Sequence, residues 1–555
     1  MTSSPFVDLL PRLPLAARSL LHVGCGDGEL GRHYRPMNPT IRLLGIESDR
    51  ARAEQAAVGF NAIAVGDIEA TPLPFNEPDG IDCLLYDGIL ERLSDPWRLV
   101  AAQASMLTPD GVVVMTLPNP GSWQVLDGVL HGRMEAELLS PPAGFTVEAV
   151  TRHLSRIGLV PCDIMECQVS RTFAEPFLAA MAPALANLGI DPETFAKRAS
   201  AGRLIWRARK EPRQRMFLRG NMLAPVGGVS HVRVVYPLRA MATDPSVITE
   251  VTDVIDTRPP QDDAPRIFVL HRPALSGEQG FKLLETLTQG GNLLVTEFDD
   301  HPDFFPMMQR GGALSFQGAH AVQTSTPALA EVLRRHNPEV AVFPNAMVSL
   351  PEIRNYTQPD TITVFFGALN REDDWEPLMP VINEVAALAG ERLRFQVIHD
   401  QGFFDALDVV HKEFTPTCDY ETYLQILGNC EVSFMPLSDT PFNRTKSDLK
   451  FIEAAACRAT PLASPIVYAD SVEHTRTGLL FASPDELRTQ LLRILALPEN
   501  AKAIANTARE HVARNRMLAY QVAPRIAWYR SLWERRESLF AAQRERVRAY
   551  YDKAA

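Results

Sequence analysis

The stretch LLHVGCGDGELGRHY, residues 20–34, decides the fold of the first half of the chain. An apolar run leads into the glycine-rich turn GCGDG (24–28), and a helix-like pattern follows. Glycine adopts positive φ without strain and lets the backbone approach a ligand closely. In open α/β sheets, ligands bind at the carboxyl ends of the strands, where such turns lie. The stretch predicts a Rossmann-like sheet with a ligand site at this turn; the alternative is a plain strand–turn–helix connection.

Two acidic residues follow the turn at suitable intervals. Glu47 ends the next apolar run about 20 residues later, where a carboxylate can bind ribose hydroxyls. Asp67 ends the third run, in AVGDIEA, where it can meet the edge of a base. A dinucleotide-binding turn would have the pattern GxGxxG, whereas this one is GxGxG with Asp27 inside it. We therefore expect a nucleoside-bearing ligand rather than a dinucleotide.

The composition is that of a globular protein. The chain has 555 residues, 46% of them hydrophobic and 22% charged, with a net charge of −12. Such a mildly acidic balance gives no global attraction to nucleic acid. No apolar run approaches the roughly 18 residues of a transmembrane helix, and the N-terminal stretch lacks the features of a secretory signal. The 7 cysteines contain no CxxC pair, so we expect reduced thiols, no metal site and a cytoplasmic protein.

Short apolar runs alternate with helix-like segments in two long stretches, which is the pattern of parallel sheets in an α/β protein. The polar segment RARKEPRQRM (207–216) separates the stretches, and a break near 349–361 divides the second into two lobes. We expect domains at 1–210, 217–352 and 353–500, followed by a helical segment at 501–555. The runs with strand-like composition are 19–24, 41–47, 62–67, 81–87, 111–118, 203–209, 231–238, 266–272, 291–299, 319–325, 361–369, 394–400 and 431–437, of which 231–238 also fits a helix.

The first stretch resembles class I S-adenosylmethionine-dependent methyltransferases over nearly all of 15–210. VGCGDGELG resembles their first motif, LLGIESD their ribose-binding acidic motif, and GDIEATPLPF their adenine-side motif. The resemblance implies a Rossmann-like methyltransferase domain that binds S-adenosyl-L-methionine. The implied cofactor-binding residues are Gly24, Gly26, Asp27 and Gly28 in the loop near the methionine part, Glu47 at the ribose, and Asp67 with Ile68 beside the adenine.

The acceptor side departs from that family. Related methyltransferases of surface-polysaccharide clusters often have Glu-His where this chain has Glu91-Arg92, and a stretch rich in Asp, His and Arg where it has ELLSPPAGFT (137–146). Tyr86, Asp87 and Glu91 are candidates for the acceptor pocket, the two carboxylates as catalytic groups. The alternative is that Asp87 caps the next helix and Glu91 is solvated.

The second stretch opens with a glycine pair. Gly227 and Gly228 precede VSHVRVVYPLRAM, which fits a helix better than a strand. Free N–H groups at a helix start favour an anion, so the pair can admit a phosphate-bearing ligand, with His231 as a catalytic candidate beside it. Asp299, in TEFDDHPDFF (296–305), lies at a strand end and is a second candidate, for contact with acceptor hydroxyls. Plain loops are the alternative at both places.

The segment SDTPFNRTKSDLKFIEAAACRATPLASP (438–465) carries the stronger signal. Ser447 is predicted to cap a helix, and Lys446, Lys450 and Glu453 recur at helical spacing on one face. Two cations near a helix start suit a diphosphate, and a carboxylate one turn further suits ribose hydroxyls. The alternative is an ordinary amphipathic helix. However, Glu453 lies in an apolar setting, FIEAAAC, where a carboxylate is paired or functional.

The stretch 217–500 resembles GT-B-fold glycosyltransferases of the retaining nucleotide-sugar type. FIEAAACRATPLAS and HTRTGLLFASPDEL resemble motifs of the donor-binding lobe, VFPNAMV (342–348) the junction between the lobes, and APVGGVSHV the glycine loop of the first lobe. The resemblance implies a nucleotide-diphosphate sugar as donor, Glu453 at its ribose, and Lys446 with Lys450 at its diphosphate.

Two positions depart from that family. Thr445 stands where the family usually has a glutamate that contacts the donor sugar. The usual Arg and Lys after the first strand of the second lobe are absent, and Arg371 is the nearby cation that can take their place.

Two functions are compatible with these motifs. The first is a bifunctional enzyme that transfers a sugar and a methyl group in cell-surface polysaccharide or glycolipid biosynthesis, with a glycan or a lipid-linked saccharide as acceptor. The second is a glycosyltransferase whose first domain only binds S-adenosylmethionine or docks a partner. The C-terminal stretch 531–553 is basic and amphipathic, and three roles are open to it: packing on the protein, peripheral contact at the inner face of the membrane, or contact with a second subunit.

Overall fold

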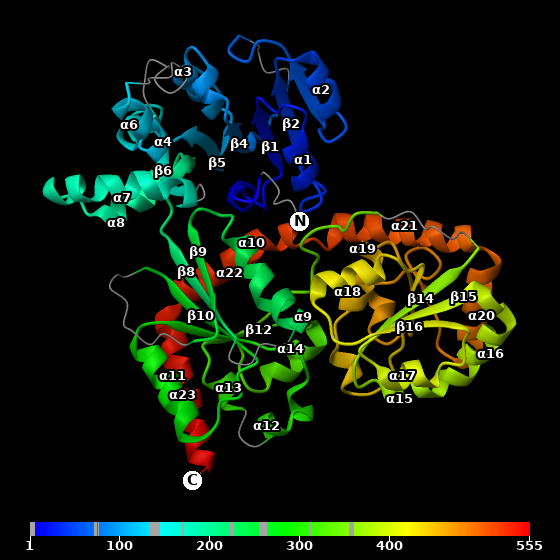
Figure 1. Cartoon of the computed structure of the whole chain (residues 1–555). Coiled ribbons are helices and arrows are strands. Elements are labelled where there is room, and N and C mark those ends of the chain that lie inside the picture. The colour runs from blue at the N-terminus through cyan, green and yellow to red at the C-terminus, as the bar shows by residue number, and fades with distance from the viewer. Residues whose placement is uncertain are drawn as a thin grey trace. The chain divides into compact units, whose positions relative to one another are not determined.

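The chain forms two compact units in the computed structural model, and Figure 1 shows their elements. The first unit comprises residues 1–215 together with 242–248, and the second comprises 216–241 and 249–555. The short segment 242–248 thus belongs with the first unit although it lies beyond the boundary expected at residue 210. The structure describes residues 6–70, 75, 77–132, 145–168, 171–222, 227–254, 264–309, 313–353 and 360–554.

The first unit is built on a seven-stranded sheet in the order β3-β2-β1-β4-β5-β7-β6. Strands β1 to β5 are parallel, whereas β7 runs antiparallel to both β5 and β6. The apolar runs predict every strand except β6, whose side chains are only half-buried or exposed. The strands are β1 Ser19–Val23, β2 Arg42–Glu47, β3 Ala62–Val65, β4 Ile81–Asp87, β5 Leu107–Pro118, β6 Val160–Gln168 and β7 Ala201–Arg209, and the helices are α1 Glu29–Tyr34, α2 Arg50–Ala56, α3 Pro96–Ala104, α4 Trp123–Leu130, α6 Val147–Arg156, α7 Arg171–Asn187 and α8 Pro192–Ala199.

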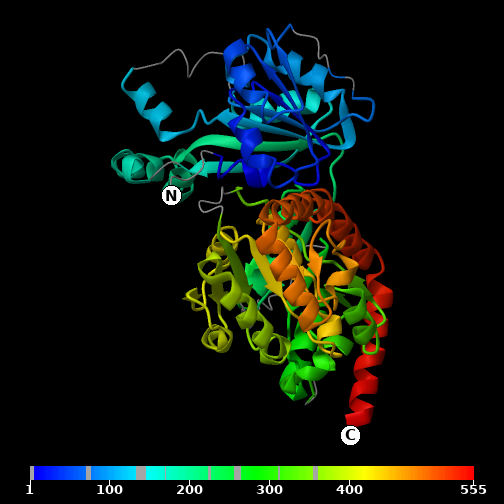
Figure 2. The same ribbon diagram turned by 90° about the vertical axis from the view of Figure 1, so that its right-hand side faces the viewer.

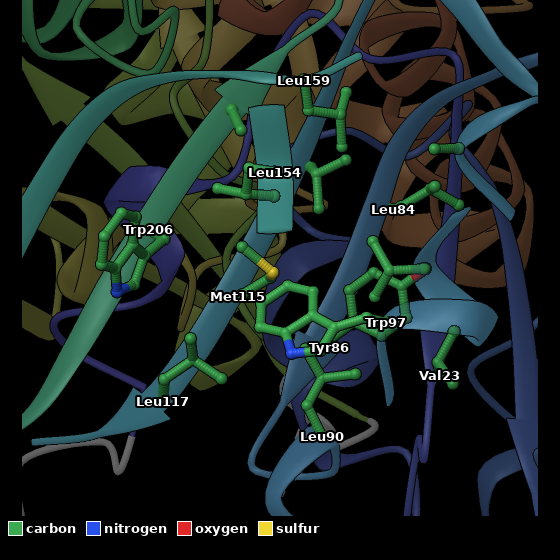
Figure 3. Packing of buried hydrophobic residues seen from close by; sticks show 14 of the residues in the cluster. Val23, Leu84, Tyr86, Leu90, Trp97, Met115, Leu117, Leu154, Leu159 and Trp206 are labelled. Carbon is green, nitrogen blue, oxygen red and sulfur yellow. The ribbon is translucent and has the colours of Figure 1, made fainter. Parts of the chain in front are cut away.

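Two apolar clusters cover the two faces of this sheet. Leu84 and Tyr86 of β4 belong to one cluster, which Figure 3 shows together with Trp97 and Trp206. Cys83 and Leu85, the alternate residues of β4, belong to the other. Successive side chains of a strand point to opposite faces, so both faces of a central strand must be apolar. The same alternation fixes which face each polar residue at a strand end takes.

The second unit has two lobes, each with a six-stranded sheet, as the resemblance to GT-B enzymes predicts. The first sheet has the order β13-β12-β11-β10-β8-β9 and the second the order β16-β15-β14-β17-β18-β19. The strands are β8 Met216–Asn221, β9 Val247–Thr252, β10 Arg266–His271, β11 Leu293–Glu297, β12 Ala321–Thr324, β13 Val340–Val342, β14 Ile362–Gly367, β15 Leu393–Ile398, β16 His411–Thr415, β17 Val432–Met435, β18 Thr460–Ala463 and β19 Leu479–Leu480. The α/β class with three Rossmann-like sheets is therefore confirmed.

Helices connect these strands, and the segment after the glycine pair is helical as expected. A helical path runs through α9 (Gly227–Ser230), a π-helical turn at His231–Val235 and α10 (Tyr236–Met241). The remaining helices of the two lobes are α11 Gly277–Gln289, α12 Pro306–Gln309, α13 Leu314–Gln317, α14 Pro327–Arg334, α15 Glu372–Trp375, α16 Met379–Ala389, α17 Gln401–Ala406, α18 Tyr420–Leu427, α19 Leu449–Ala456 and α20 Pro484–Ala496.

The C-terminal helices return to the first lobe: α23 lies beside α11 in Figure 1, where the rings of Phe281 and Tyr551 are in edge contact, and Figure 2 shows the same red helix running to the C-terminus. The Tyr529 hydroxyl donates to Oε1 of Gln323 on β12 at 2.6 Å, and the Gln543 amide donates to the Gly318 carbonyl at 3.1 Å. The tail therefore packs on the protein. Across the described ranges, no helix has the length and apolar character needed to span a bilayer. These helices are α21 Pro498–Asn515, α22 Val522–Glu534 and α23 Arg536–Ala554.

Candidate functional site

The glycine turn of the first unit has the backbone that only glycine adopts easily. Gly24, Gly26 and Gly28 have φ of 73°, 59° and 80°. A Cβ at Gly28 would also lie 2.8 Å from the Cα of Ala56, so this position has no room for a side chain. The turn thus presents bare backbone at the carboxyl end of β1, as a ligand-binding loop requires.

Glu47 is fixed beside this turn. It ends β2 and is 5% exposed. Its carboxylate accepts the Gly26 N–H at 2.7 Å and the Asp49 N–H at 3.0 Å. A carboxylate has about four acceptor sites, so it can hold the loop and still accept ligand hydroxyls. The structure therefore brings the glycine loop and the predicted ribose carboxylate together.

The other predicted residues of this site differ in their surroundings. Asp27 accepts the Glu29 N–H at 3.1 Å and pairs with Arg32 at 3.1 Å. Asp67 is exposed after β3 and accepts the Glu69 N–H at 3.0 Å. Ile68 is buried, and its side chain belongs to the apolar cluster of the sheet. The cofactor roles of these residues stay predictions.

On the acceptor side, the structure differs from the expectation for Tyr86 and from the alternative given for Asp87 and Glu91. Tyr86 is fully buried, and its hydroxyl donates to Oε1 of Gln103 at 2.6 Å, so it belongs to the core and the prediction that it lines a pocket is wrong. Glu91 is not solvated, because its carboxylate accepts Nη2 of Arg203 at 2.9 Å. Asp87 ends β4 and does not cap the following short helix, which has no side-chain cap. The predicted acceptor segment 137–146 lies outside the described residues up to position 144.

The predicted donor residues of the second unit gather around one pocket of about 520 Å³ between its lobes. Lys446, Lys450 and Glu453 line it from the second lobe, and Gly228 and Asp299 line it from the first. Arg371, the substitute cation, lines it as well. His231 is not among the lining residues; it is exposed on the π-helical turn, where its ring lies 5.6 Å from that of Tyr236. The surroundings of Gly227 lie outside the described part of the chain, so its predicted role stays a prediction.

The base of the pocket holds the buried carboxylate of Glu453, which is 3% exposed. Burial raises the pKa of Glu453 to about 6, against the opposing effects of the Lys450 ammonium and the hydroxyls of Tyr420 and Tyr423. Burial also lowers the pKa of Lys450, whose ammonium donates to the Gly367 carbonyl. The sequence motifs do not indicate the two tyrosines, although CDYETY (418–423) places them one turn apart on α18.

Lys446 is engaged across the cleft. Its ammonium lies 2.5 Å from Oδ1 of Asp300 in the opposite lobe. Burial lowers the pKa of Lys446, and Asp300 acts against that change. Asp300 and Asp299 both face Arg272, whose Nε lies 2.6 Å from Asp299. Lys446 thus meets a carboxylate where the prediction places a diphosphate.

The start of α19 also differs from expectation. The helix begins at Leu449 after Asp448, so Lys446 precedes it and Ser447 is not its cap. The Ser447 hydroxyl instead accepts the Asn345 amide at 2.8 Å, which ties the lobe junction to the donor segment. Thr445 is buried, its hydroxyl donates to the Phe442 carbonyl at 2.8 Å, and it does not line the pocket.

Comparison with known proteins agrees with this division of the chain. Residues 21–115 match a family model described as a methyltransferase domain, and residues 381–526 match one described as glycosyl transferase-like. An uncharacterized 37.1 kDa protein in transposon TN4556 of Streptomyces fradiae is 34% identical over 122 residues, which are 21% of this chain and 34% of that protein. Trans-aconitate 2-methyltransferase of Escherichia coli (strain SE11) is 27% identical over 118 residues, which are 21% of this chain and 46% of that enzyme.

The chain thus spans less than half the length of these curated relatives. Among solved structures, Alr3699/HepE of Anabaena in complex with UDP-glucose has a TM-score of 0.42 and 12% identity, over 56% of this chain and 99% of that one. Sucrose-phosphate synthase of Thermosynechococcus elongatus has a TM-score of 0.42 and 17% identity, over 58% and 100%. Neither TM-score is high enough for these likenesses to bear on function. The two family models carry the identification: this chain joins a methyltransferase domain in its first half to a glycosyl transferase-like domain in its second.

Proposed function

We propose that the chain is a bifunctional transferase that moves a methyl group from S-adenosylmethionine and a sugar from a nucleotide-diphosphate sugar onto a cell-surface glycan or glycolipid. The observation that carries the sugar-transfer half is the joint placement of Lys446, Lys450 and Glu453 in one pocket between two Rossmann-like lobes. Cations suit a diphosphate and the carboxylate suits ribose hydroxyls.

The methyl-transfer half rests on the glycine turn and Glu47. The residues present fit S-adenosylmethionine: the turn leaves no space for side chains, and the Glu47 carboxylate is held at its rim. Bound there, this cofactor supplies an electrophilic methyl group attached to a sulfonium. In this proposal Glu47 holds the ribose and orients the cofactor, while Asp87 and Glu91 lie toward the acceptor.

A second function is favoured by one observation. Oε1 of Glu91 accepts a hydrogen bond from Arg203, and Oε2 is buried, which disfavours transfer of a proton from an acceptor to this carboxylate. In this alternative the first domain binds S-adenosylmethionine without transferring its methyl group, and only the sugar transfer is catalytic.

Two binding measurements on the full chain test the proposal. Calorimetry with S-adenosylhomocysteine should show binding that Glu47→Ala weakens by roughly 1–3 kcal/mol, because a charged hydrogen-bonding group is lost. A panel of UDP, GDP and ADP should contain a nucleotide that binds wild type and binds Glu453→Gln more weakly. Each variant should leave the other ligand's affinity unchanged, and equal affinity of Glu47→Ala and wild type would refute the ribose assignment.

Transfer of a labelled methyl group separates the two functions. Wild-type protein incubated with methyl-labelled S-adenosylmethionine and a mixed pool of bacterial glycans and glycolipids should label the pool if the first domain is catalytic. Binding of the cofactor with no labelling, alongside sugar transfer, would favour the second function.

A further inference from the structure

Arg203, a residue that no motif indicates, lies at the carboxyl edge of the first sheet, the edge at which β1, β2 and β4 end. Thr116 pairs with Asp87 across β4 and β5, and Pro118 pairs with Arg203 across β5 and β7. Strand alternation puts Asp87, Thr116 and Arg203 on one face of the sheet. The apolar residues next to them on that face share one cluster: Cys83, Leu85, Val112, Val114 and Ile205.

The guanidinium of Arg203 is anchored through one nitrogen. Nη2 donates to Oε1 of Glu91 at 2.9 Å and to the Thr116 carbonyl at 3.2 Å. The group lies against Gly88, where a Cβ would be 3.0 Å from Nη2 and where φ is 65°. A glycine at position 88 thus makes room for the guanidinium beside the end of β4.

The cation is more exposed than its counter-ion. The Arg203 side chain is 43% exposed, whereas that of Glu91 is 18% exposed. In the described part of the chain, no group accepts a hydrogen bond from Nη1, and Nε is buried without a partner. Nη1 therefore keeps its donors for a ligand, while the contacts of Nη2 with Glu91 and Thr116 hold the guanidinium in place.

This cation lies next to the glycine turn. A Cβ at Gly24 would be 2.9 Å from Cγ1 of Ile89, so the residue after Gly88 packs against the turn itself. A ligand seated on the turn and an acceptor beside Gly88 would be direct neighbours. The anchored arginine is thus placed to orient the acceptor, which is a role distinct from holding the cofactor.

We infer that Arg203 binds a carboxylate of the methyl acceptor, so that the methyltransferase domain selects acidic sugar units over neutral ones. This inference rests on the proposed methyl transfer. Nη1 can donate a charge-assisted hydrogen bond to a carboxylate, and an anchored guanidinium loses little entropy on binding. Arg203 is a positioning residue in this scheme, because it fixes the acceptor without taking part in bond making.

The test compares two probes that differ only at the carboxylate. p-Nitrophenyl β-D-glucuronide carries a carboxylate where p-nitrophenyl β-D-glucoside carries a hydroxymethyl group. Binding of each to the full chain, saturated with S-adenosylhomocysteine, can be measured by calorimetry or ligand-observed NMR. Wild type should prefer the glucuronide by about fivefold or more, the Arg203→Gln variant should show no preference, and Arg203→Lys should retain part of it.

Arg98 provides a matched control, since it is 72% exposed on α3 of the same unit. Arg98→Gln should keep the wild-type preference. Thermal melting establishes that Arg203→Gln is folded, and if it is not, Arg203→Lys alone decides through a reduced preference. Absence of a preference in wild type, or a full preference in the Arg203 variants, would overturn the inference. Failure of S-adenosylhomocysteine to bind wild type would instead refute the proposed methyl transfer, and the two probes measured without it would still test the anion site.

Discussion

Single side chains in the second unit acquire their chemistry from burial. Glu453 is almost fully enclosed, and the hydroxyls of Tyr420 and Tyr423 act to lower its pKa while burial raises it. Removing water disfavours the charged form of a carboxylate, and the nearby Lys450 only partly offsets this effect. The pKa of Glu453 is therefore about 6, closer to neutrality than that of a carboxylate in water.

This titration should make nucleotide binding depend on pH. The pKa of Glu453 is raised to about 6, so the carboxylate takes up a proton as pH falls through that value and loses acceptor sites for ribose hydroxyls. We expect the affinity for the tightest of UDP, GDP and ADP to fall by about tenfold per pH unit well below 6. Calorimetric titrations at a series of pH values measure this fall.

The Glu453→Gln variant is the control, since it has no proton to gain at this position. It should keep only the pH dependence that the nucleotide's own phosphate brings. Identical pH profiles in the variant and the wild type would show that Glu453 does not face the ligand.

The Lys446–Asp300 pair predicts a second effect of a single residue. The Asp300 carboxylate is paired with the Lys446 ammonium at 2.5 Å. A diphosphate must therefore compete with Asp300 for this ammonium. Asp300→Asn should tighten nucleotide diphosphate binding by roughly 1 kcal/mol, about fivefold. Calorimetry measures the change, with the exposed Asp485→Asn as a control of equal charge change. Weaker binding in Asp300→Asn would mean that Asp300 supports the site and does not compete with the ligand.

At the scale of elements, three segments meet at the start of α19. Arg516, at the end of α21, pairs with Asp448 at 2.7 Å and donates to the Asn345 carbonyl at 3.1 Å. The Asn345 amide in turn donates to Ser447. The lobe junction, the donor segment and the C-terminal helices are therefore held by one set of polar contacts.

Arg516→Met should destabilise the second unit by roughly 3 kcal/mol, because it leaves the largely buried Asp448 carboxylate without its cation. Chemical denaturation followed by fluorescence measures the loss. Arg514→Met is the matched control, since Arg514 is 71% exposed and its pair with Glu510 contributes little. Equal stability of the two variants would contradict a structural role for the Arg516–Asp448 pair.

At the scale of the whole molecule, the two compact units should respond to ligands separately. A ligand stabilises only the unit that binds it, by about 2.7 kcal/mol at a hundredfold excess over Kd. In differential scanning calorimetry, S-adenosylhomocysteine should raise one transition and the nucleotide diphosphate the other. Glu47→Ala should abolish the first shift and keep the second. A single transition that both ligands raise would show that the units unfold together.

The sequence alone determined the fold class and most of the strands. Local signals suffice here, because buried parallel strands are short apolar runs and the glycine turn needs a backbone that few residues adopt. The pairing of Gly26 with Glu47 follows from the same logic, since the ends of neighbouring parallel strands meet at one edge. By contrast, the half-exposed edge strand β6 has no such run and is not predicted.

The tertiary structure decided what is paired with what. Only the fold brings Asp300 to Lys446, Arg203 to Glu91, and Thr243 of the segment 242–248 to Arg207 of the first unit. These partners lie 36 to 146 positions apart in the chain. Spacing along one helix or strand carries no information on such contacts. The burial that raises the pKa of Glu453 likewise depends on how elements distant in sequence pack around it. The same packing decides that His231 lies outside the pocket.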